Sequence, residues 1–369
     1  MSDTGTNTAK GFAGRLGILN VAIGILFIAI VTIYMVHLSK RPLYNSDMLS
    51  YMGIALQIKG FDAQQLHDSV YTITKAHVPA KAFVNLTSTN DGRVERYNDY
   101  RSFYDYLRYF RLKPLYVFVI KTFYDSGINL VFATILPSLI FTGGLLIAFF
   151  YGLQKLFKSN IFPFVIGLIV MLFSYTNQLV CLSTPDAMSS FQVFILFLNL
   201  FFKGKEAVSY CILALCIFTR IDNLTLLPFI LYYYRFDKVN IKSLVKAFLL
   251  ISAVVIIVSV VPFLFGNHTF WFIDFIYKPS VYVAMVIKSA GLMRTDFNLL
   301  FLLLAMLLFF ILSNQTRLRS LFVGVVLLSC TRFLLFPSYE ERFYFIFKLM
   351  IVFIGLAAFA DRIQLKNNI

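Results

Sequence analysis

The chain has 369 residues, of which 59% are hydrophobic and only 14% are charged, and this composition excludes an ordinary soluble domain. Its formal net charge is +15, but the basic residues lie in short clusters between apolar runs. Such clusters indicate membrane topology and argue against a nucleic-acid-binding surface. The apolar runs are continuous and do not alternate with a period of two, which predicts membrane-spanning helices rather than strands.

We predict an all-α polytopic membrane protein, a single transmembrane domain over residues 1–369 with about ten spans, several of which have the roughly 20 apolar residues that a crossing helix needs. In chain order the predicted spans are residues 16–38, 128–154, 161–180, 185–202, 207–219, 223–235, 243–265, 296–313, 319–336 and 342–361. With these spans the Lys and Arg clusters fall on one side, which the positive-inside rule assigns to the cytoplasm together with both termini. The first span is too long for the core of a signal peptide, so we expect it to remain in the mature protein.

The connections on the other side are more elaborate. Residues 41–127 form a first extracytoplasmic loop in which aromatic residues from Tyr97 to Phe110 have the spacing of amphipathic, interfacial helices. The segment "KPLYVFVIKTFYDSG" is apolar but too short to cross, which predicts a re-entrant or surface helix. Residues 266–295 form a second extracytoplasmic loop that carries the only tryptophan, Trp271.

Asp47 and Tyr51 lie in "RPLYNSDMLSYMGIALQIKG", directly after the first span. Either Asn45 or Ser46 can cap a helix that runs to Gly60. Asp47 then lies in the first turn, where the helix dipole keeps a carboxylate ionised. A purely structural first-turn aspartate has the same appearance, but the position in the first outer loop favours a catalytic base.

Asp186 lies in "CLSTPDAMSS", where Thr184 is a plausible helix cap and Pro185 a natural first helical residue. This capping pattern explains Asp186 without any function. A contact with substrate or metal is the alternative.

Arg220 and Asp222 belong to the polar tetrad "RIDN", which two unusually short apolar segments flank. Polar residues held below the headgroups usually line a cavity or a functional site. Mutual neutralisation of the two side chains is the alternative. The sequence shows no internal repeat, which weakens the interpretation as an inverted-repeat transporter.

The stretch "SYEERFYF" predicts an anion site at the start of the last span. Ser338 and Glu341 have the spacing of a capping box. A cation such as Arg342 in the first helical turn opposes the helix dipole, whereas a bound anion reverses that penalty. Arginine suits phosphate oxygens; pairing with Glu340 or Glu341, or snorkelling to headgroups, is the alternative. Glu341 stays a candidate substrate contact at the same outward end.

Arg332 and Lys348 are weaker candidates for the same anion. His67, His77 and His268 lie in outer loops without ligand spacing, and the four cysteines form no CxxC pair. No cofactor is expected with certainty, and a divalent metal is left open.

The layout resembles the GT-C superfamily of integral-membrane glycosyltransferases, such as protein O-mannosyltransferases and lipid A aminoarabinose transferases. The resemblance rests on the motifs "NSDMLSY", "KPLY", "STPDAMSS", "TRIDNLTLLP" and "ERFYF" in their order along the chain. The first motif carries a single acid where many members have an Asp-Glu pair, which puts a metal-dependent mechanism in doubt. There is no large C-terminal soluble domain, so we expect the outer loops to recognise the acceptor.

The resemblance implies a polyprenyl-phosphate-linked sugar donor and a glycan, lipid or protein acceptor, at the outer face of a bacterial inner (plasma) membrane. Asp47 is then the general base for the acceptor hydroxyl. Arg342, with Arg220, stabilises the departing phosphate, and inversion at the anomeric carbon is the family expectation. A multi-pass lipid or polysaccharide transporter or flippase and a non-catalytic membrane subunit are the rival hypotheses. Membrane acyl transfer usually needs a His or Ser arrangement that is absent here.

Overall fold

The computed structural model describes residues 5–157, 159–235, 279–292, 315–335 and 340–366, together with short stretches between 245 and 312. The described residues form helices and the turns between them, and no named strand occurs among them; Leu43 and Leu182 form one isolated β-bridge. The prediction of an all-α protein is therefore confirmed for this part of the chain.

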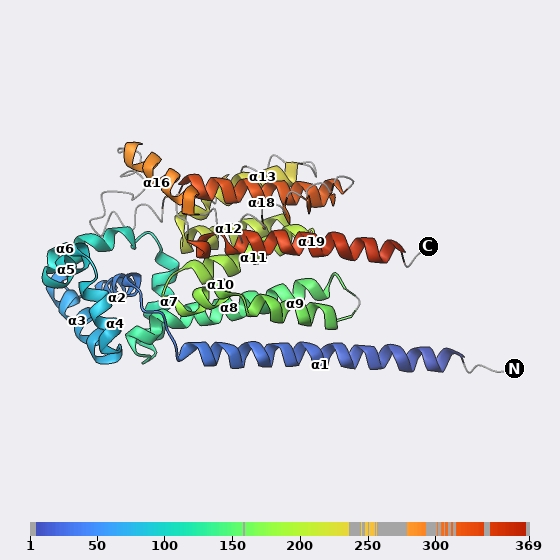
Figure 1. Ribbon diagram of the computed structural model, residues 1–369, viewed down its shortest axis with the longest axis horizontal. Helices are drawn as coiled ribbons and strands as arrows, with labels where there is room; N and C mark the ends of the chain where they lie inside the picture. The colour runs from blue at the N-terminus through green and yellow to red at the C-terminus, as the bar shows by residue number, and fades with distance from the viewer. Residues whose placement is uncertain are drawn as a thin grey trace.

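The helices lie in two groups that follow one another along the long axis of the molecule, a bundle of long helices and a cap of short ones (Figure 1). In chain order they are α1 (Gly5–Ser39), α2 (Ser46–Ile58), α3 (Ala63–His77), α4 (Ala80–Ser88), α5 (Asp91–Asn98), α6 (Tyr100–Tyr106), the 3₁₀ turn η1 (Leu107–Tyr109), α7 (Pro114–Asp125), α8 (Leu130–Gln154), α9 (Ile161–Met171), α10 (Ser174–Cys181), α11 (Asp186–Phe201), α12 (Glu206–Thr219), η2 (Ile221–Thr225), α13 (Leu226–Arg235), α16 (Pro279–Leu292), α18 (Thr316–Leu335), η3 (Glu341–Phe343) and α19 (Phe345–Lys366). The long helices run roughly parallel, and α2 to α6 form a cap at the end opposite the start of α1 and the end of α19 (Figure 1).

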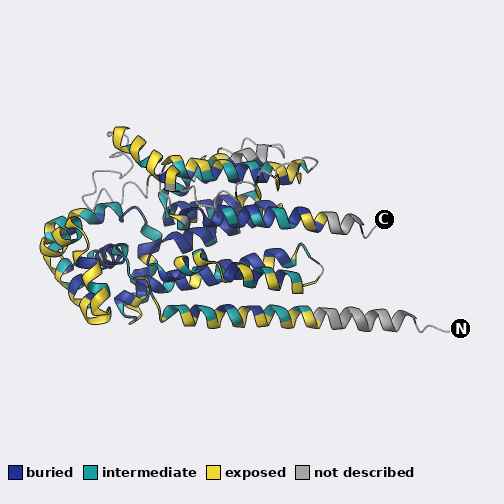
Figure 2. Cartoon of the chain, in the orientation of Figure 1, coloured by how far each residue is buried: buried dark blue, intermediate teal, exposed yellow. Residues whose placement is uncertain are grey.

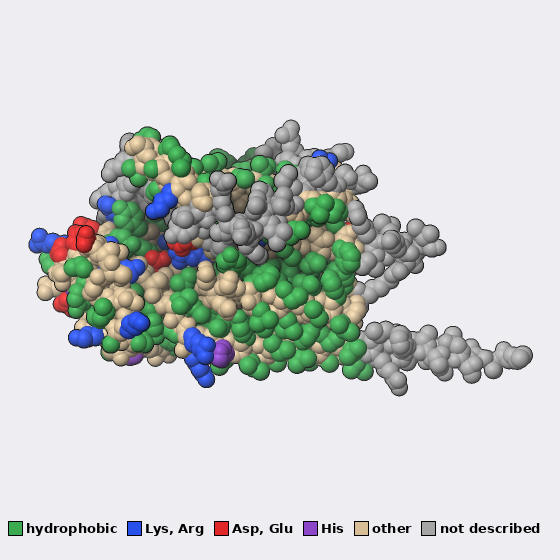
Figure 3. All heavy atoms as spheres, viewed as in Figure 1, with side chains coloured by type: hydrophobic (Ala, Val, Ile, Leu, Met, Phe, Trp, Pro, Cys, Tyr) green, Lys and Arg blue, Asp and Glu red, His purple; other side chains and the backbone are tan. Residues whose placement is uncertain are grey.

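Three described helices are long and apolar enough to cross a membrane: Ile18–Ser39 of α1, then α8 and α18. The bent pair α9 and α10 makes a fourth if it counts as one span. Much of the surface of α1 is exposed (Figure 2), and the exposed side chains along the long helices are apolar, whereas charged side chains gather at the α2–α6 end (Figure 3). An apolar belt with a charged end is the surface expected of a membrane protein.

The count of about ten spans stays a prediction. The spans expected at 243–265 and 296–313 lie mostly outside the described residues, as does most of the second outer loop with Trp271, of which α16 is described. In the described part, α11 and α12 have 16 and 14 residues, shorter than a full crossing.

The expected single helix over 161–180 is wrong, because α9 and α10 meet at an angle of 65°. Two residues, Leu172 and Phe173, lie between them, and Phe173 has extended backbone angles. The break frees carbonyl groups at the end of α9, and neighbouring hydroxyls bind them. The Tyr34 hydroxyl of α1 donates to the Met171 carbonyl at 2.9 Å, and the Thr176 hydroxyl donates to the Val170 carbonyl at 2.7 Å.

We expect Tyr34→Phe to lower the free energy of unfolding by about 1 kcal/mol, because the Met171 carbonyl loses a donor in a partly buried place. Thermal unfolding of the purified protein in detergent measures the change. Tyr151→Phe is the matched control, since Tyr151 is exposed and its hydroxyl has no hydrogen bond among the described residues. An equal shift of the melting temperature in both variants would show that Tyr34 does not stabilise the break.

Candidate functional site

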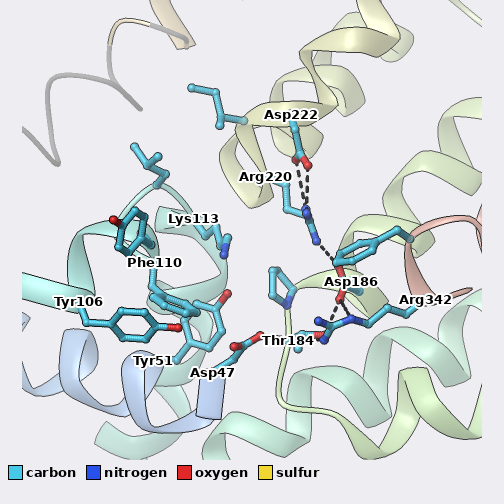
Figure 4. A pocket seen from close by; sticks show the side chains of 15 residues that line it. Asp47, Tyr51, Tyr106, Phe110, Lys113, Thr184, Asp186, Arg220, Asp222 and Arg342 are labelled. Atoms are coloured by element: carbon cyan, nitrogen blue, oxygen red, sulfur yellow. Dashed lines mark hydrogen bonds and ion pairs between the residues drawn. The ribbon is translucent and has the colours of Figure 1, made fainter. Parts of the chain in front are cut away.

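A cavity of about 480 Å³ lies where α2, η1 and the start of α7 meet the N-terminal end of α11, the turn after α12 and η3 (Figure 4). It is lined by Asp47, Tyr51, Tyr106, Tyr109, Phe110, Leu112, Lys113, Thr184, Pro185, Asp186, Arg220, Ile221, Asp222, Arg342 and Phe343. The structure thus brings together six of the seven predicted site residues, which lie far apart in the sequence. The seventh, Glu341, belongs to η3, but its side chain lies outside the described part of the chain.

A short backbone contact brings together the segments that carry two of the cavity's aspartates, Asp47 and Asp186. The Leu43 N–H donates to the Cys181 carbonyl at 2.9 Å, and Leu43 and Leu182 form the isolated parallel bridge. The link between α1 and α2 therefore runs beside the link between α10 and α11. Asp47 follows the first link and Asp186 follows the second, so both carboxylates face the same cavity.

The link before Asp186 is buried and not helical, so its polar groups need partners. The Ser138 hydroxyl of α8 donates to the Leu182 carbonyl at 2.6 Å, and the Thr134 hydroxyl donates to the Ser183 hydroxyl at 3.1 Å. These bonds hold the link against α8, which fixes the position of the α11 N-terminus.

Asp186 is not explained by the expected capping pattern. Pro185 is the residue before α11 rather than its first helical residue, and no side chain caps this helix. The Thr184 hydroxyl instead donates to the Asp186 carboxylate at 2.9 Å. Asp186 is only 5% exposed, so its charge requires compensation from cations.

Arg220 provides the first part of this compensation. It lies between α12 and η2 and has extended backbone angles. Its guanidinium pairs with Asp186 and donates two hydrogen bonds to Asp222, at 3.0 and 3.1 Å (Figure 4). Asp222 also pairs with Arg332 of α18. The expected neutralisation of Arg220 by Asp222 is therefore present, but it is one part of a larger network that continues to Asp186.

Hydrogen bonds between uncharged side chains also stabilise this network. The Asn223 side chain donates to the Ser189 hydroxyl at 2.9 Å, and the Thr219 hydroxyl donates to Gln192 at 2.8 Å. Both bonds join α11 to the segment around Arg220. They keep the arginine within reach of Asp186.

Arg342 joins the network to α2. It lies 2.6 Å from the Glu340 carboxylate, 3.7 Å from Asp186 and 4.0 Å from Asp47. The pairing with Glu340 was one of the alternatives derived from the sequence. Arg342 lies in η3, ahead of α19, which begins at Phe345; the argument from an opposing dipole in the first turn of the last helix is therefore wrong.

Two other predictions concern residues near Arg342 in the sequence: the capping box, and the weaker candidate cations. Ser338 lies outside the described residues, so the capping box with Glu341 stays a prediction. Arg332, expected to be a weaker candidate, belongs to the ion-pair network, whereas Lys348 does not line the cavity.

Phe343 holds the cationic side of the cavity together. The guanidinium groups of Arg342, Arg220 and Arg332 lie 4.9, 5.3 and 5.7 Å from the centre of its ring. Cation–π contacts of this kind stabilise guanidinium groups that have lost water. Of these three arginines, Arg220 and Arg342 line the cavity, and both are paired with carboxylates.

Lys113 is the site residue that the sequence analysis missed. It precedes Pro114 at the start of α7, and its ammonium lies 4.7 Å from the ring centre of Phe110 and 5.4 Å from that of Tyr51. Within the described part of the chain it has no carboxylate partner. The available signal was its place in "KPLY", between interfacial aromatics and a short apolar helix.

The environment of Lys113 weakens its hold on a proton. Burial and the neighbouring Arg220 lower the pKa of Lys113 to about 8, against the opposing effect of Asp47, Asp186 and Asp222. The ammonium is still the main form at neutral pH. Lys113 is therefore a cation that can exchange its aromatic contacts for an anionic ligand.

Tyr51 is fully buried, and its ring packs edge-on against Phe110 and Tyr116, at centre distances of 5.2 and 4.7 Å. Its hydroxyl makes no hydrogen bond in the described structure. Burial and the nearby Asp47 raise the pKa of Tyr51 well above its usual range, so the phenol stays neutral. It can donate one hydrogen bond to a ligand but is no base.

A divalent metal, left open by the sequence, does not fit the described carboxylates. Among the described residues no three His, Cys, Asp or Glu side chains lie close enough together to hold a metal ion. Asp186 and Asp222 each pair with two arginines, and Asp47 faces Arg342. Oxygen atoms that accept from guanidinium groups are poor candidates for hard-cation ligands.

No protein-family model, curated protein or solved structure matches the chain.

We expect Asp222→Ala to lower the free energy of unfolding by about 3 kcal/mol, because it leaves Arg220 and Arg332 buried with fewer counter-charges. The melting temperature in detergent measures the loss. Asp125→Ala is the control, since it breaks only the exposed pairs with Lys59 and Lys121 and should leave the melting temperature nearly unchanged. Comparable shifts in both variants would contradict a buried role for Asp222.

Proposed function

We propose that the protein is a membrane glycosyltransferase of the GT-C type, which moves a sugar from a polyprenyl-phosphate-linked donor to an acceptor hydroxyl at the extracytoplasmic face. The observation that carries the proposal is the cavity in which Asp47 faces cations from three other segments, Lys113, Arg220 and Arg342. A base opposite a cluster of cations is what displacement of a phosphate leaving group requires.

Asp47 is the carboxylate best suited to act as the base. Its side chain is 27% exposed, and its described polar contact is the distant pair with Arg342 at 4.0 Å. Asp186 and Asp222 are buried and held by arginines, so they have no free face for a substrate proton. An acceptor hydroxyl in the cavity can therefore give its proton to Asp47 within hydrogen-bond reach.

The cations of the cavity stabilise the leaving group of the proposed reaction. In the step, the acceptor oxygen bonds to the anomeric carbon while the bond from that carbon to the phosphate oxygen breaks, and the phosphate departs with the electron pair. Lys113 supplies a charge that no carboxylate of the described residues holds, and Arg342 offers a planar donor group at the cavity wall. Both stabilise the negative charge that develops on the leaving phosphate.

The position of the cavity suits a lipid-linked donor. It lies at the cap end of the apolar helices, where a phosphate headgroup can enter while its hydrocarbon chain stays against the apolar surface (Figures 1 and 3). With the cytoplasmic termini expected from the positive charges, this end is the extracytoplasmic one, and α2 to α6 are the interfacial helices.

A flippase for lipids or polysaccharides remains the second hypothesis from the sequence. It requires polar side chains along a path through several spans. In the described residues the charged side chains of the cavity instead lie together at one end, and most of them are joined by ion pairs. The arrangement favours chemistry at a fixed site.

We expect Asp47→Asn to reduce sugar transfer by about 10²- to 10⁴-fold, because the amide cannot accept the acceptor proton. The assay measures transfer of radiolabelled sugar from a panel of polyprenyl-phosphate sugars in membranes that contain the protein. Asp91→Asn is the matched control, because Asp91 also lies in the first turn of an outer helix, α5, but does not line the cavity. Transfer that survives Asp47→Asn would remove this residue as the base.

We expect the KM for the donor to rise as the pH increases through about 8, because Lys113 loses its charge there and binds the donor phosphate more weakly. Below this pH the ammonium is protonated and the KM should be flat. In Lys113→Arg the charge persists at all these pH values, so the rise should disappear. Lys121→Arg, at the exposed far end of α7, should keep the wild-type profile. A rise of equal size in Lys113→Arg would show that another group titrates.

A further inference from the structure

A second hollow, of about 390 Å³, lies on α5, α6 and η1 beside the cavity, and we call it the outer groove. Its charged lining consists of three acids, Glu95, Asp99 and Asp105, and three arginines, Arg96, Arg101 and Arg108. The acids and arginines balance in charge. The proposed reaction with Asp47 and the cations uses none of these residues.

The outer groove adjoins the cavity. Tyr106 and Tyr109 line both hollows, so these two rings lie between them. Tyr106 also lies on the Asp47 side of the cavity (Figure 4). Burial and the nearby Asp47 carboxylate raise the pKa of Tyr106, which agrees with a short path from the groove to that carboxylate.

The two shared rings are held in place by arginines of the groove. The Arg96 guanidinium lies 4.0 Å from the ring centre of Tyr106. The Arg108 guanidinium lies 4.8 Å from the ring centre of Tyr109 and donates to its hydroxyl at 2.8 Å. A wall that is already positioned loses little conformational entropy when a ligand binds.

The chemistry of the lining selects among ligand classes. Guanidinium groups only donate hydrogen bonds and carboxylates only accept them, whereas a hydroxyl does both. A ligand rich in hydroxyl groups therefore matches alternating arginines and acids. The balanced charge disfavours a strongly anionic ligand, and the scarcity of apolar side chains disfavours an acyl chain.

We propose that the outer groove is the acceptor site and that the acceptor is a neutral glycan, whose terminal hydroxyl passes Tyr106 to reach Asp47. The role as acceptor rests on the proposed function, whereas binding of a neutral glycan in the groove does not. Arg342, one of the cations proposed to bind the donor phosphate, lies across the cavity from Tyr106 (Figure 4), so both substrates can occupy the site together.

The test is ligand-observed saturation-transfer NMR on the full chain in nanodiscs. The probes are neutral oligosaccharides, maltohexaose and chitohexaose, together with a serine- and threonine-rich decapeptide and glycerophosphoglycerol. The groove variant is Arg101→Ala with Asp105→Ala, since both residues are exposed. The matched control is Lys81→Ala with Asp91→Ala, which removes the same charges from α4 and α5 outside the groove.

We expect an oligosaccharide to receive saturation from the wild type and the control, and to bind about tenfold more weakly to the groove variant. Equal binding to all three proteins, or saturation of the peptide or glycerophosphoglycerol alone, overturns the proposal. So does a lack of binding by every probe. If the double variant has a lower melting temperature than the control, the isosteric Asp105→Asn replaces it in the same comparison.

The two proposals fail in different ways. Oligosaccharide binding that depends on the groove, without transfer from any polyprenyl-phosphate sugar, would support a carbohydrate-binding site and contradict the glycosyltransferase activity. Transfer that depends on Asp47 but is insensitive to the groove variant at low acceptor concentration would support the glycosyltransferase activity and contradict the groove as the acceptor site.

Discussion

The buried guanidinium of Arg220 is the group on which the site end of the molecule depends. Taking a charge of this kind out of water costs several kcal/mol unless paired groups surround it, so Asp186 and Asp222 must both lie beside it. Because Asp186 begins α11, Asp222 lies in η2 and Arg332 of α18 pairs with Asp222, the ion pairs fix three segments relative to one another. Arg342 then extends the network from Asp186 towards α2.

The same end of the molecule contains backbone that is not helical although much of it is buried. In an apolar environment every free N–H and carbonyl needs a partner, and here neighbouring hydroxyls and amides supply it. Tyr34 binds the end of α9, Ser138 binds the link before α11, and Asn223 binds the carbonyl of Cys216 at the end of α12. Such breaks shorten the helices and leave polar side chains at helix ends, where they can line a cavity instead of facing lipid.

The charged residues of the cavity differ in how strongly other residues of the chain bind them. Carboxylates that hold buried arginines are committed to structure, whereas among the described residues Asp47 is joined to the network only through a long pair with Arg342. Among the cations, Lys113 rests on aromatic rings instead of a carboxylate. The residues with the weakest internal attachments are those with the most to gain from a ligand. Both of them line the same cavity.

The helical membrane character and most of the charged residues at the site could be predicted from the amino-acid sequence. Continuous apolar runs require helices, and a charge beside them is conspicuous, so Asp47, Asp186, Arg220, Asp222 and Arg342 could be found from the sequence. The three-dimensional arrangement was needed to show which carboxylates are paired with arginines, that Lys113 has no described carboxylate partner, and that the 161–180 segment bends. These properties depend on partners distant in the chain, such as Tyr34 for the bend and Leu43 for the link before α11, and spacing along a sequence carries no record of such contacts.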